Sequence, residues 1–443
     1  MSGEPAEHRS TPRLRGGTSG EPAEHRSTPR LRGVSDRLIA DVRELAGTIG
    51  PGGTGTPGER AAADYVAARL AALGLPVARR TFRATSSQNA FPLASALLVL
   101  GATALYPRGR AWRWAAAVPA LAAAPLLWRA IRTSGNALRP LLPSVTSGNV
   151  VARAAPREPT ARRVVLLAHL DTNRARVAWQ SDGVRWLEPM TWITLAMLGL
   201  SGALYTIGAL EGSVSKGQGG PERLWAVSLL PAAYAAGMVA TLVRDELTAF
   251  SPGAHDNAAS VAVALETAAG LVEQPLRDTE VVLAFTGAEE TDHAGLYDLL
   301  RAERGAVRAA AFIGLEGLGS GRLAYLTRQG LCDHVRPDRG LLELARAVAA
   351  RRPELGAEPW ELTLEDEVTT LRRLGYRAIC VAGCDPHSRA LPRWHRTDDT
   401  ADSVSPEFME RAADFVRALL DEIDGAAPRD PGPAPGGATP GRS

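Results

Sequence analysis

Four uncharged and strongly apolar segments stand out in this sequence, and they form two closely spaced pairs. They are residues 84–107, 114–128, 189–210 and 224–243. At 1.5 Å per residue, each of the last two is long enough to cross the hydrocarbon core of a bilayer, which is about 30 Å thick. Tryptophan side chains, which favour membrane–water interfaces, lie at or near the segment ends: Trp112, Trp114, Trp128, Trp192 and Trp225.

We therefore expect two hairpins of transmembrane helices, over residues 88–131 and 187–245. The protein would then be a multi-pass membrane protein in contact with a lipid bilayer. The alternative is that these segments are helices buried in the core of a soluble protein. That alternative applies best to 114–128, which is short and contains Pro119 and Pro125.

The charge balance and the cysteine count exclude two classes of protein. The 443 residues include 50 Lys and Arg against 48 Asp and Glu, which gives a net charge of +2. A nucleic-acid-binding protein normally carries a clear basic excess, so we expect no nucleic-acid partner. Three cysteines exclude a scaffold built on disulfides.

The two ends of the chain are predicted to be disordered tails. Residues 19–33 repeat residues 2–16 letter for letter, as SGEPAEHRSTPRLRG. This composition cannot bury enough apolar surface to offset its ordering entropy, so residues 1–34 are predicted to be disordered and His8 and His25 are poor metal ligands. The segment also lacks the apolar stretch of a secretory signal. Residues 425–443, rich in Pro and Gly, form the second predicted tail.

The remaining residues, 35–424, are predicted to fold as one α/β domain interrupted by the two hairpins. Order is expected to begin at Ser35, as the N-cap of a helix. The expected strands are 77–84, 149–154, 164–168, 280–286, 309–315 and 377–382, and further helices are expected over 57–73, 257–272, 338–350 and 406–423. Nearly continuous apolar strands are typical of a mostly parallel sheet with helices on both faces.

Polar residues follow several of these strands at positions that do not suit a core. They are His169 and Asp171, Asp256 in the loop before a helix, Glu289 and Glu290, Glu316, and His395 in an acidic turn. Ligands of open α/β sheets bind beyond the carboxyl ends of the strands. Imidazole and carboxylate ligands suit Zn²⁺.

Each of these motifs also has a purely structural interpretation. Taken alone, H-x-D is commonly an imidazole hydrogen-bonded to a nearby acid, and a Glu pair is commonly a solvated helix face. Asp256 followed by Asn257 can be a helix N-cap. The complete set in this order favours a metal site.

The set resembles the dinuclear zinc aminopeptidases, a family that includes bacterial leucyl aminopeptidases and membrane-anchored relatives. The family pattern is H-x-D, then G-A-x-D-N, then a Glu pair after an apolar strand, then an acid that closes the next strand, then a His before D-T. The matching residues are His169 and Asp171, Asp256 and Asn257, Glu289 and Glu290, Glu316, and His395 before Asp399 and Thr400. The resemblance covers about 35–423 apart from the apolar segments, and it implies a zinc-exopeptidase-like α/β fold.

The resemblance also implies a role for each matching residue. Two Zn²⁺ ions per chain would share Asp256, with His169 and Glu316 on one ion and Glu290 and His395 on the other. Glu289 would be the general base, and Asp171 would hold the His169 ring through its second nitrogen.

The chain departs from the family pattern at three places. Glu316 stands where the family usually has Asp, which could alter metal spacing or selectivity. The interval from Asp171 to Asp256 is much longer than usual because it contains the second hairpin. The loop after Glu290 is also longer, and its His293 is interpreted as an exposed loop histidine, with a substrate-side donor as the alternative.

Cys380 and Cys384 lie near the expected site at the end of a predicted strand. We expect them to pack as small residues, with a disulfide as the alternative. A zinc-binding pair is not expected, because no second Cys/His pair accompanies them.

The expected function is hydrolysis of the N-terminal peptide bond of a peptide substrate by a membrane-anchored zinc aminopeptidase. One alternative is another amide hydrolase or a cyclising enzyme, although relatives that cyclise N-terminal glutamine use a single zinc. Another is a metal-free receptor or adaptor with the same fold. The sequence indicates neither a preferred peptide sequence nor an oligomeric state.

We expect the catalytic domain to lie in the cytoplasm. Its export would require about 90 residues with several arginines to cross ahead of the first span, without a signal peptide. Arg108, Arg110 and Arg113 in the first hairpin's joint oppose this orientation, whereas Arg79, Arg80, Arg83, Arg129 and Arg132 on the domain side favour it.

Overall fold

The apolar strands assemble into one eight-stranded mixed sheet in the order β1-β2-β4-β3-β5-β8-β6-β7. The structure is a computed structural model that describes residues 29–132, 139–176, 179, 181–214 and 220–426. The central strands β4, β3, β5 and β8 run parallel, and antiparallel pairing attaches β1 and β2 at one side and β6 at the other. The strands are β1 Val77–Thr85, β2 Ser144–Ala154, β3 Arg162–His169, β4 Thr279–Thr286, β5 Ala311–Glu316, β6 Arg322–Gln329, β7 Glu358–Leu362 and β8 Arg377–Cys384.

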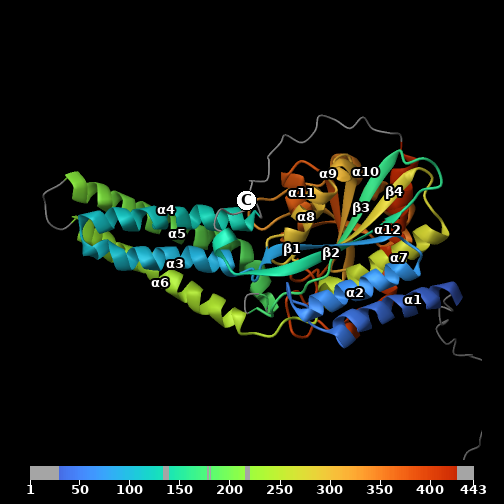
Figure 1. Cartoon of the computed structure of the whole chain (residues 1–443), viewed down its shortest axis with the longest axis horizontal. Helices are drawn as coiled ribbons and strands as arrows, with labels where there is room; N and C mark the ends of the chain where they lie inside the picture. Colours follow the sequence, from blue (N-terminus) through green and yellow to red (C-terminus); the bar gives the residue numbers. More distant parts are fainter. Residues whose placement is uncertain (1–28, 133–138, 177–178, 180, 215–219, 427–443) are drawn as a thin grey trace, which may run out of the picture.

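Helices cover both faces of this sheet, as the apolar strands require (Figure 1). One apolar core lies between the sheet and α1 Pro29–Val42, α2 Pro57–Ala72, α7 Ser260–Glu273, α10 Arg339–Arg351 and α12 Pro406–Gly425. A second core lies against α8 Ala294–Ala302, α9 Arg304–Val307 and α11 Glu367–Arg373. The predicted α/β fold with a largely parallel sheet centre is therefore confirmed.

The first helix begins earlier than expected. Helix α1 starts at Pro29, inside the sequence repeat, so residues 29–34 are helical and Ser35 is not the N-cap. The fixed φ of proline suits the first turn of a helix, and the Ser35 hydroxyl donates a hydrogen bond to Glu410 on α12. The rest of the two predicted tails, with His8 and His25, lies outside the described residues.

The two apolar insertions form a bundle of four long helices that projects from the sheet domain (Figure 1). The helices are α3 Ala90–Leu105, α4 Arg110–Ile131, α5 Leu187–Val214 and α6 Gly220–Glu246. They pack on one another through small side chains and through Tyr106 and Tyr205, whose rings lie 5.0 Å apart. All four are long and apolar enough to cross a membrane.

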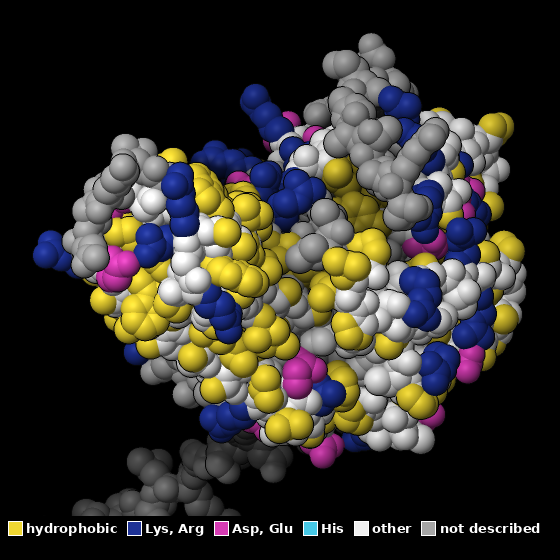
Figure 2. All heavy atoms as spheres, turned by 60° about the vertical axis from the view of Figure 1, so that its left-hand side comes forward, with side chains coloured by type: hydrophobic (Ala, Val, Ile, Leu, Met, Phe, Trp, Pro, Cys, Tyr) yellow, Lys and Arg dark blue, Asp and Glu magenta, His cyan; other side chains and the backbone are white. Residues whose placement is uncertain are grey.

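The outer surface of this bundle is apolar. Val118 and Leu230 are each about two-thirds exposed, and Figure 2 shows that apolar side chains cover much of the bundle. Between 22% and 39% of the apolar part of each helix is buried. The helices therefore do not form the core of the α/β domain, contrary to the alternative interpretation.

Both insertions leave the domain at the same edge of the sheet. The parallel strands β3, β4 and β5 end there, at His169, Thr286 and Glu316. Because β2 runs antiparallel to β1 and β4, the end of β1 and the start of β2 lie at this edge as well. The bundle is thus attached where the expected site residues converge.

Cys380 and Cys384 lie four positions apart on strand β8, and both are buried and free. Four residues of extended chain span about 13 Å, whereas a disulfide needs Cα atoms within about 7 Å of each other. Both side chains belong to the second apolar core. They pack as expected, and the disulfide alternative is wrong.

Candidate metal centre

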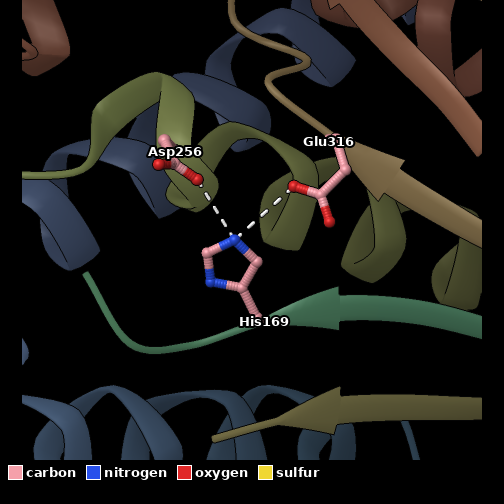
Figure 3. Close-up of side chains that lie close together, drawn as sticks. All are labelled: His169, Asp256 and Glu316. Carbon is pink, nitrogen blue, oxygen red and sulfur yellow. Dashed lines mark hydrogen bonds and ion pairs between the residues drawn. The ribbon is translucent and has the colours of Figure 1, made fainter. Parts of the chain in front are cut away.

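The first group of converging side chains consists of His169, Asp256 and Glu316. His169 Nε2 lies 3.1 Å from Asp256 Oδ1 and 3.5 Å from Glu316 Oε2 (Figure 3). The strands β3 and β5 end at His169 and Glu316, and Asp256 comes from the irregular turn Ala254–Ala259 that precedes α7. All three are buried, and their ligand atoms lie close enough together to hold one metal ion.

The second group consists of Asp256, Glu290 and His395. His395 Nε2 lies 3.2 Å from Asp256 Oδ2 and 3.0 Å from Glu290 Oε1. Asp256 therefore belongs to both groups and directs one carboxylate oxygen into each. This is the arrangement that a residue shared by two metal ions requires.

Asp256 is held by contacts from three other parts of the chain. Its backbone N–H and that of His255 donate to the Asp399 carboxylate, at 3.2 and 2.9 Å. The side chain of Asn257, which follows a cis peptide bond, donates to the carbonyl of Leu315 at 2.9 Å. Gly253 has φ 74°, and a Cβ there would lie 2.4 Å from Thr172 Cγ2, so only glycine fits.

The separations between the converging atoms suit metal coordination. Zinc bonds of about 2.0–2.1 Å in a tetrahedron place neighbouring ligand atoms about 3.3 Å apart, and the nitrogen–oxygen distances here are 3.0–3.5 Å. Burial by itself would lower the pKa of His395, but Glu290 and Asp256 raise it to about 9. Burial raises the pKa of Glu316 well above its usual value. A buried cluster with this much acid favours a bound cation.

Glu289 lies beside these groups but, among the described residues, belongs to neither of them. It is buried, and burial raises its pKa well above the usual range. Its neighbour is His293, whose Nε2 lies 3.2 Å from Glu289 Oε1. A carboxylate next to a metal centre, but outside the ligand groups, is available to accept a proton.

The prediction that His293 is an exposed loop residue is wrong. Its side chain is 4% exposed, and its Nδ1 lies 2.9 Å from the Thr370 hydroxyl on α11. The reason is the backbone: Asp292 and His293 have φ of 78° and 49°, so the loop turns sharply inward before α8. Asp and His are enriched at such left-handed positions, but most Asp and His residues lie elsewhere, so the sequence gives only a weak signal for this turn.

Asp171 contacts the second nitrogen of the His169 ring, through its backbone carbonyl and not its carboxylate. His169 Nδ1 donates to the backbone carbonyl of Asp171 at 2.9 Å, while the Asp171 carboxylate is 3.8 Å away. That carboxylate accepts from the backbone N–H groups of Glu289 and Glu290, at 3.0 and 3.2 Å. A fully buried carboxylate needs donors, and here it finds them in the Glu pair. Asp171 therefore holds the His169 ring through its backbone carbonyl, and its carboxylate positions Glu289 and Glu290.

Three residues that the sequence analysis did not single out also contact the site. Asn173 Nδ2 donates to Glu290 Oε2 at 2.7 Å, and the N–H of Arg176 donates to the His395 carbonyl at 3.2 Å. The Trp179 ring lies 5.2 Å from the His395 ring. Their only signal in the sequence is that they follow His169 within ten positions. The structure brings together all of the predicted ligands, with Glu289 and Asp171.

Comparison with known proteins relates the chain to one peptidase family. Residues 241–420 match the model of Peptidase family M28. No curated protein matches the chain in sequence.

Solved structures with a similar fold include two glutaminyl cyclases. The enzyme of Porphyromonas gingivalis is 15% identical, with a TM-score of 0.51 over 88% of this chain and 98% of that chain. The enzyme of Fimbriiglobus ruber is 15% identical, with a TM-score of 0.51 over 91% and 99%. The zinc aminopeptidase BSAP of Bacillus subtilis is 15% identical, with a TM-score of 0.49 over 88% and 94%. At these identities the likeness concerns the fold alone.

Proposed function

We propose that the α/β domain, of which residues 241–420 match the model of Peptidase family M28, is a zinc-dependent aminopeptidase held in a membrane by the four-helix bundle. One observation carries the proposal. Two groups of buried ligand atoms share Asp256, and Glu289 lies next to them without belonging to either. Metal-assisted hydrolysis requires both: ligands that hold the metal ions and a separate carboxylate that accepts the proton of the attacking water.

In this proposal the chain holds two Zn²⁺ ions. His169 and Glu316 would hold one, Glu290 and His395 would hold the other, and Asp256 would be shared. When bound, the ions would supply Lewis-acid polarisation of the scissile carbonyl and would lower the pKa of bound water towards about 7.

Glu289 accepts the proton of the attacking water and returns it to the leaving amine. Burial raises the pKa of this carboxyl group above its usual range, which favours uptake of a proton. Proton transfer of this kind contributes about 10²–10⁴-fold to the rate. Asp171 holds the backbone of Glu289 and Glu290 in register with the ligand groups.

A second candidate function is cyclisation of N-terminal glutamine. It is favoured by the fold likeness to glutaminyl cyclases. A centre with a single metal would need only one of the two ligand groups, so the presence of both supports hydrolysis. A third candidate, a metal-free receptor or adaptor, would need neither group.

The test is to purify the full chain in detergent, measure its zinc content and supply peptides that begin with Leu, Ala or Gln. We expect about two zinc equivalents per chain and release of the first amino acid, which a chelator abolishes. One equivalent, with release of ammonia from the Gln peptide, would instead support the cyclase. A folded protein without metal and without turnover would support the receptor or adaptor.

We also propose that the catalytic domain faces the cytoplasm. The support is the arginines at the domain-side ends of the helices, such as Arg129, Arg132 and Arg244, together with those of β1. Arginines in the joint between α3 and α4, at the far end of the bundle, oppose this orientation. Labelling of engineered cysteines on intact cells distinguishes the two orientations.

A further inference from the structure

We propose that the substrates of this site are peptides anchored in the same membrane, whose free N-terminus lies only a few residues from the bilayer surface. The inference rests on the proposed peptidase function and adds the class of substrate. It follows from where the bundle is attached, what its base contacts and where its membrane boundary lies.

The bundle is attached close to the metal ligands. Helix α6 ends at Glu246, ten positions before Asp256, and α3 begins five positions after β1 ends at Thr85. The α/β domain therefore meets the bundle at the edge of the sheet that carries the ligands. The bundle lies on one side of the domain (Figure 1).

A set of hydrogen bonds joins the base of the bundle to the second ligand group. The amide of Asn173 donates to Glu290 Oε2 at 2.7 Å and to Gln88 Oε1 at 2.9 Å. Gln88 is two residues ahead of α3. The next residue, Asn89, donates to Glu246 at the end of α6, at 2.7 Å. The Asn173 side chain thus links a proposed metal ligand to Gln88, and the adjacent Asn89 links the start of α3 to the end of α6.

Arg176 makes a second connection between the same two regions. Its guanidinium, which is buried, donates to Asn173 Oδ1 at 2.9 Å and also to Asn89 Oδ1. Its backbone N–H donates to the carbonyl of His395. Both Glu290 and His395 are therefore held by residues that also hold the bundle base.

A small cavity is lined both by a proposed metal ligand and by residues at the base of the bundle. Its lining includes Glu290 and Asn173, Gln88 ahead of α3, and Phe250 after α6. The Arg174 guanidinium lies 4.2 Å from the centre of the Phe250 ring and pairs with Glu246. Space next to a metal ligand is therefore bordered by the segments that enter and leave the membrane helices.

Two tryptophans indicate where the membrane boundary lies relative to the domain. Trp128 and Trp192 lie near the domain-side ends of α4 and α5, with their rings 5.8 Å apart. Tryptophans of this kind mark the membrane–water interface. Trp192 comes five residues after Leu187 begins α5, which is about 7–8 Å along a helix. The interface thus lies within about two helical turns of the domain.

One hydrogen-bonded side chain and about 7–8 Å of helix thus separate the metal ligands from the membrane interface, a distance on the order of 10–20 Å. An extended chain covers 3.3–3.6 Å per residue, so about 3–6 residues bridge that distance. A peptide anchored in the same bilayer is confined near the site and gains effective concentration. A longer flexible segment dilutes its N-terminus into the solvent and loses that gain.

The experiment uses the full chain in lipid nanodiscs, both faces of which are open to solvent. The substrates share one Leu-initiated sequence and end either in an amide or in a phosphatidylethanolamine anchor, with flexible spacers of about 5, 15 and 40 residues. Release of leucine is measured at equal total peptide concentration, with the Glu289→Gln variant as the background. A soluble zinc aminopeptidase, added to the same discs, measures how accessible each anchored peptide is.

After correction for accessibility, we expect the anchored peptide with the shortest spacer to be cleaved at least about tenfold faster than the soluble peptide. The advantage should fall with spacer length and disappear in excess detergent micelles. Equal rates for soluble and anchored peptides, or a rate that rises with spacer length, would overturn the inference and leave the peptidase function intact. No leucine from any peptide would overturn the peptidase function and this inference with it.

Discussion

His293 Nε2 lies 3.2 Å from Glu289 Oε1, while His293 Nδ1 lies 2.9 Å from the hydroxyl of Thr370. Burial lowers the pKa of His293, which favours the neutral ring. One arrangement of protons satisfies both contacts and the carboxylate: the Thr370 hydroxyl donates to Nδ1, and Nε2–H donates to Glu289. This arrangement fixes one oxygen of the proposed base and leaves the other oxygen free.

Replacing the proposed base should separate catalysis from metal binding. In Glu289→Gln we expect zinc content near that of the wild type and a fall in kcat of at least about a hundredfold, because only the proton acceptor is lost. Zinc analysis and single-peptide kinetics measure the two effects. Glu361→Gln, at an exposed glutamate on β7, is the matched control and should be silent. Loss of both metals in Glu289→Gln would show that Glu289 is a ligand.

Replacing His293, which contacts the proposed base Glu289, should lower kcat without changing KM or zinc content. In His293→Ala we expect kcat to fall about tenfold with KM and zinc content unchanged, since the carboxylate loses its fixed orientation. Thr370→Val should give a smaller fall in the same direction, and Thr370→Ser should restore the wild-type rate because it keeps the hydroxyl. If Thr370→Ser is as slow as Thr370→Val, the effect is one of packing and the positioning role is refuted.

The ligand groups should lose metal one at a time. His395→Ala is expected to reduce zinc from about two equivalents to about one, because His169, Asp256 and Glu316 remain. His387→Ala, at an exposed histidine after β8, should keep both. Glu316→Asp, which restores the residue usual in the family it resembles, should be tolerated. Complete loss of metal in Glu316→Asp would mean that the longer side chain compensates for a shifted backbone.

Asp292 should make stability depend on pH. Burial raises its pKa from 3.8 to about 6 in the folded state, against the smaller opposing effect of Arg139. The folded state then binds more protons than the unfolded state between pH 4 and 6, so stability falls as pH rises through this window and the loss persists above it. Asn tolerates the positive φ of this position. Asp292→Asn should therefore raise the Tm at pH 8 and have little effect at pH 4.

Thermal unfolding of chelator-treated wild type and Asp292→Asn, at pH 4, 5, 6 and 8, measures this difference. We expect a stabilisation of about 3 kcal/mol at pH 8. Asp402→Asn, at an exposed aspartate, should show no such trend. A stabilisation of equal size at every pH would exclude the titration of Asp292 as its cause.

The parts of the molecule that follow from local pattern could be predicted from the sequence. Apolar strands of the sheet centre, such as β3 and β4, are continuous hydrophobic runs, and the residues that follow them converge because parallel strands end at one edge. Strands β6 and β7 were not predicted, because Arg322, Arg328 and Glu361 interrupt their apolar pattern near the far side of the sheet.

Contacts between distant residues could not be predicted in the same way. Asn173 and Glu290 are 117 positions apart, and their hydrogen bond depends on how the β3 loop folds against the turn after β4. The two contacts of Asp171, through its carbonyl with the His169 ring and through its carboxylate with the backbone of the Glu pair, likewise depend on where a loop backbone passes. The burial of His293 could not be predicted, because it depends on two consecutive left-handed residues that turn its loop inward, and the enrichment of Asp and His in that conformation is only a weak signal.

The last prediction concerns which side of the membrane holds the catalytic domain. In both hairpins the chain leaves the α/β domain and returns to it at the same edge of the sheet. If all four helices cross the bilayer, the tips of the bundle and the domain must therefore lie on opposite sides of it.

A thiol reagent can test this orientation. Of the three cysteines, Cys332 is partly exposed and could itself react with the reagent, whereas Cys380 and Cys384 are buried. In a Cys332→Ser background, Glu211→Cys places a thiol near the bundle tip and Asp402→Cys places one on the domain. With the domain in the cytoplasm, an impermeant thiol reagent on intact cells should label Glu211→Cys and not Asp402→Cys, and both should be labelled after lysis. The reverse pattern would put the domain outside, and protection of both in intact cells with labelling of both after lysis would show that the helices do not cross the cell membrane.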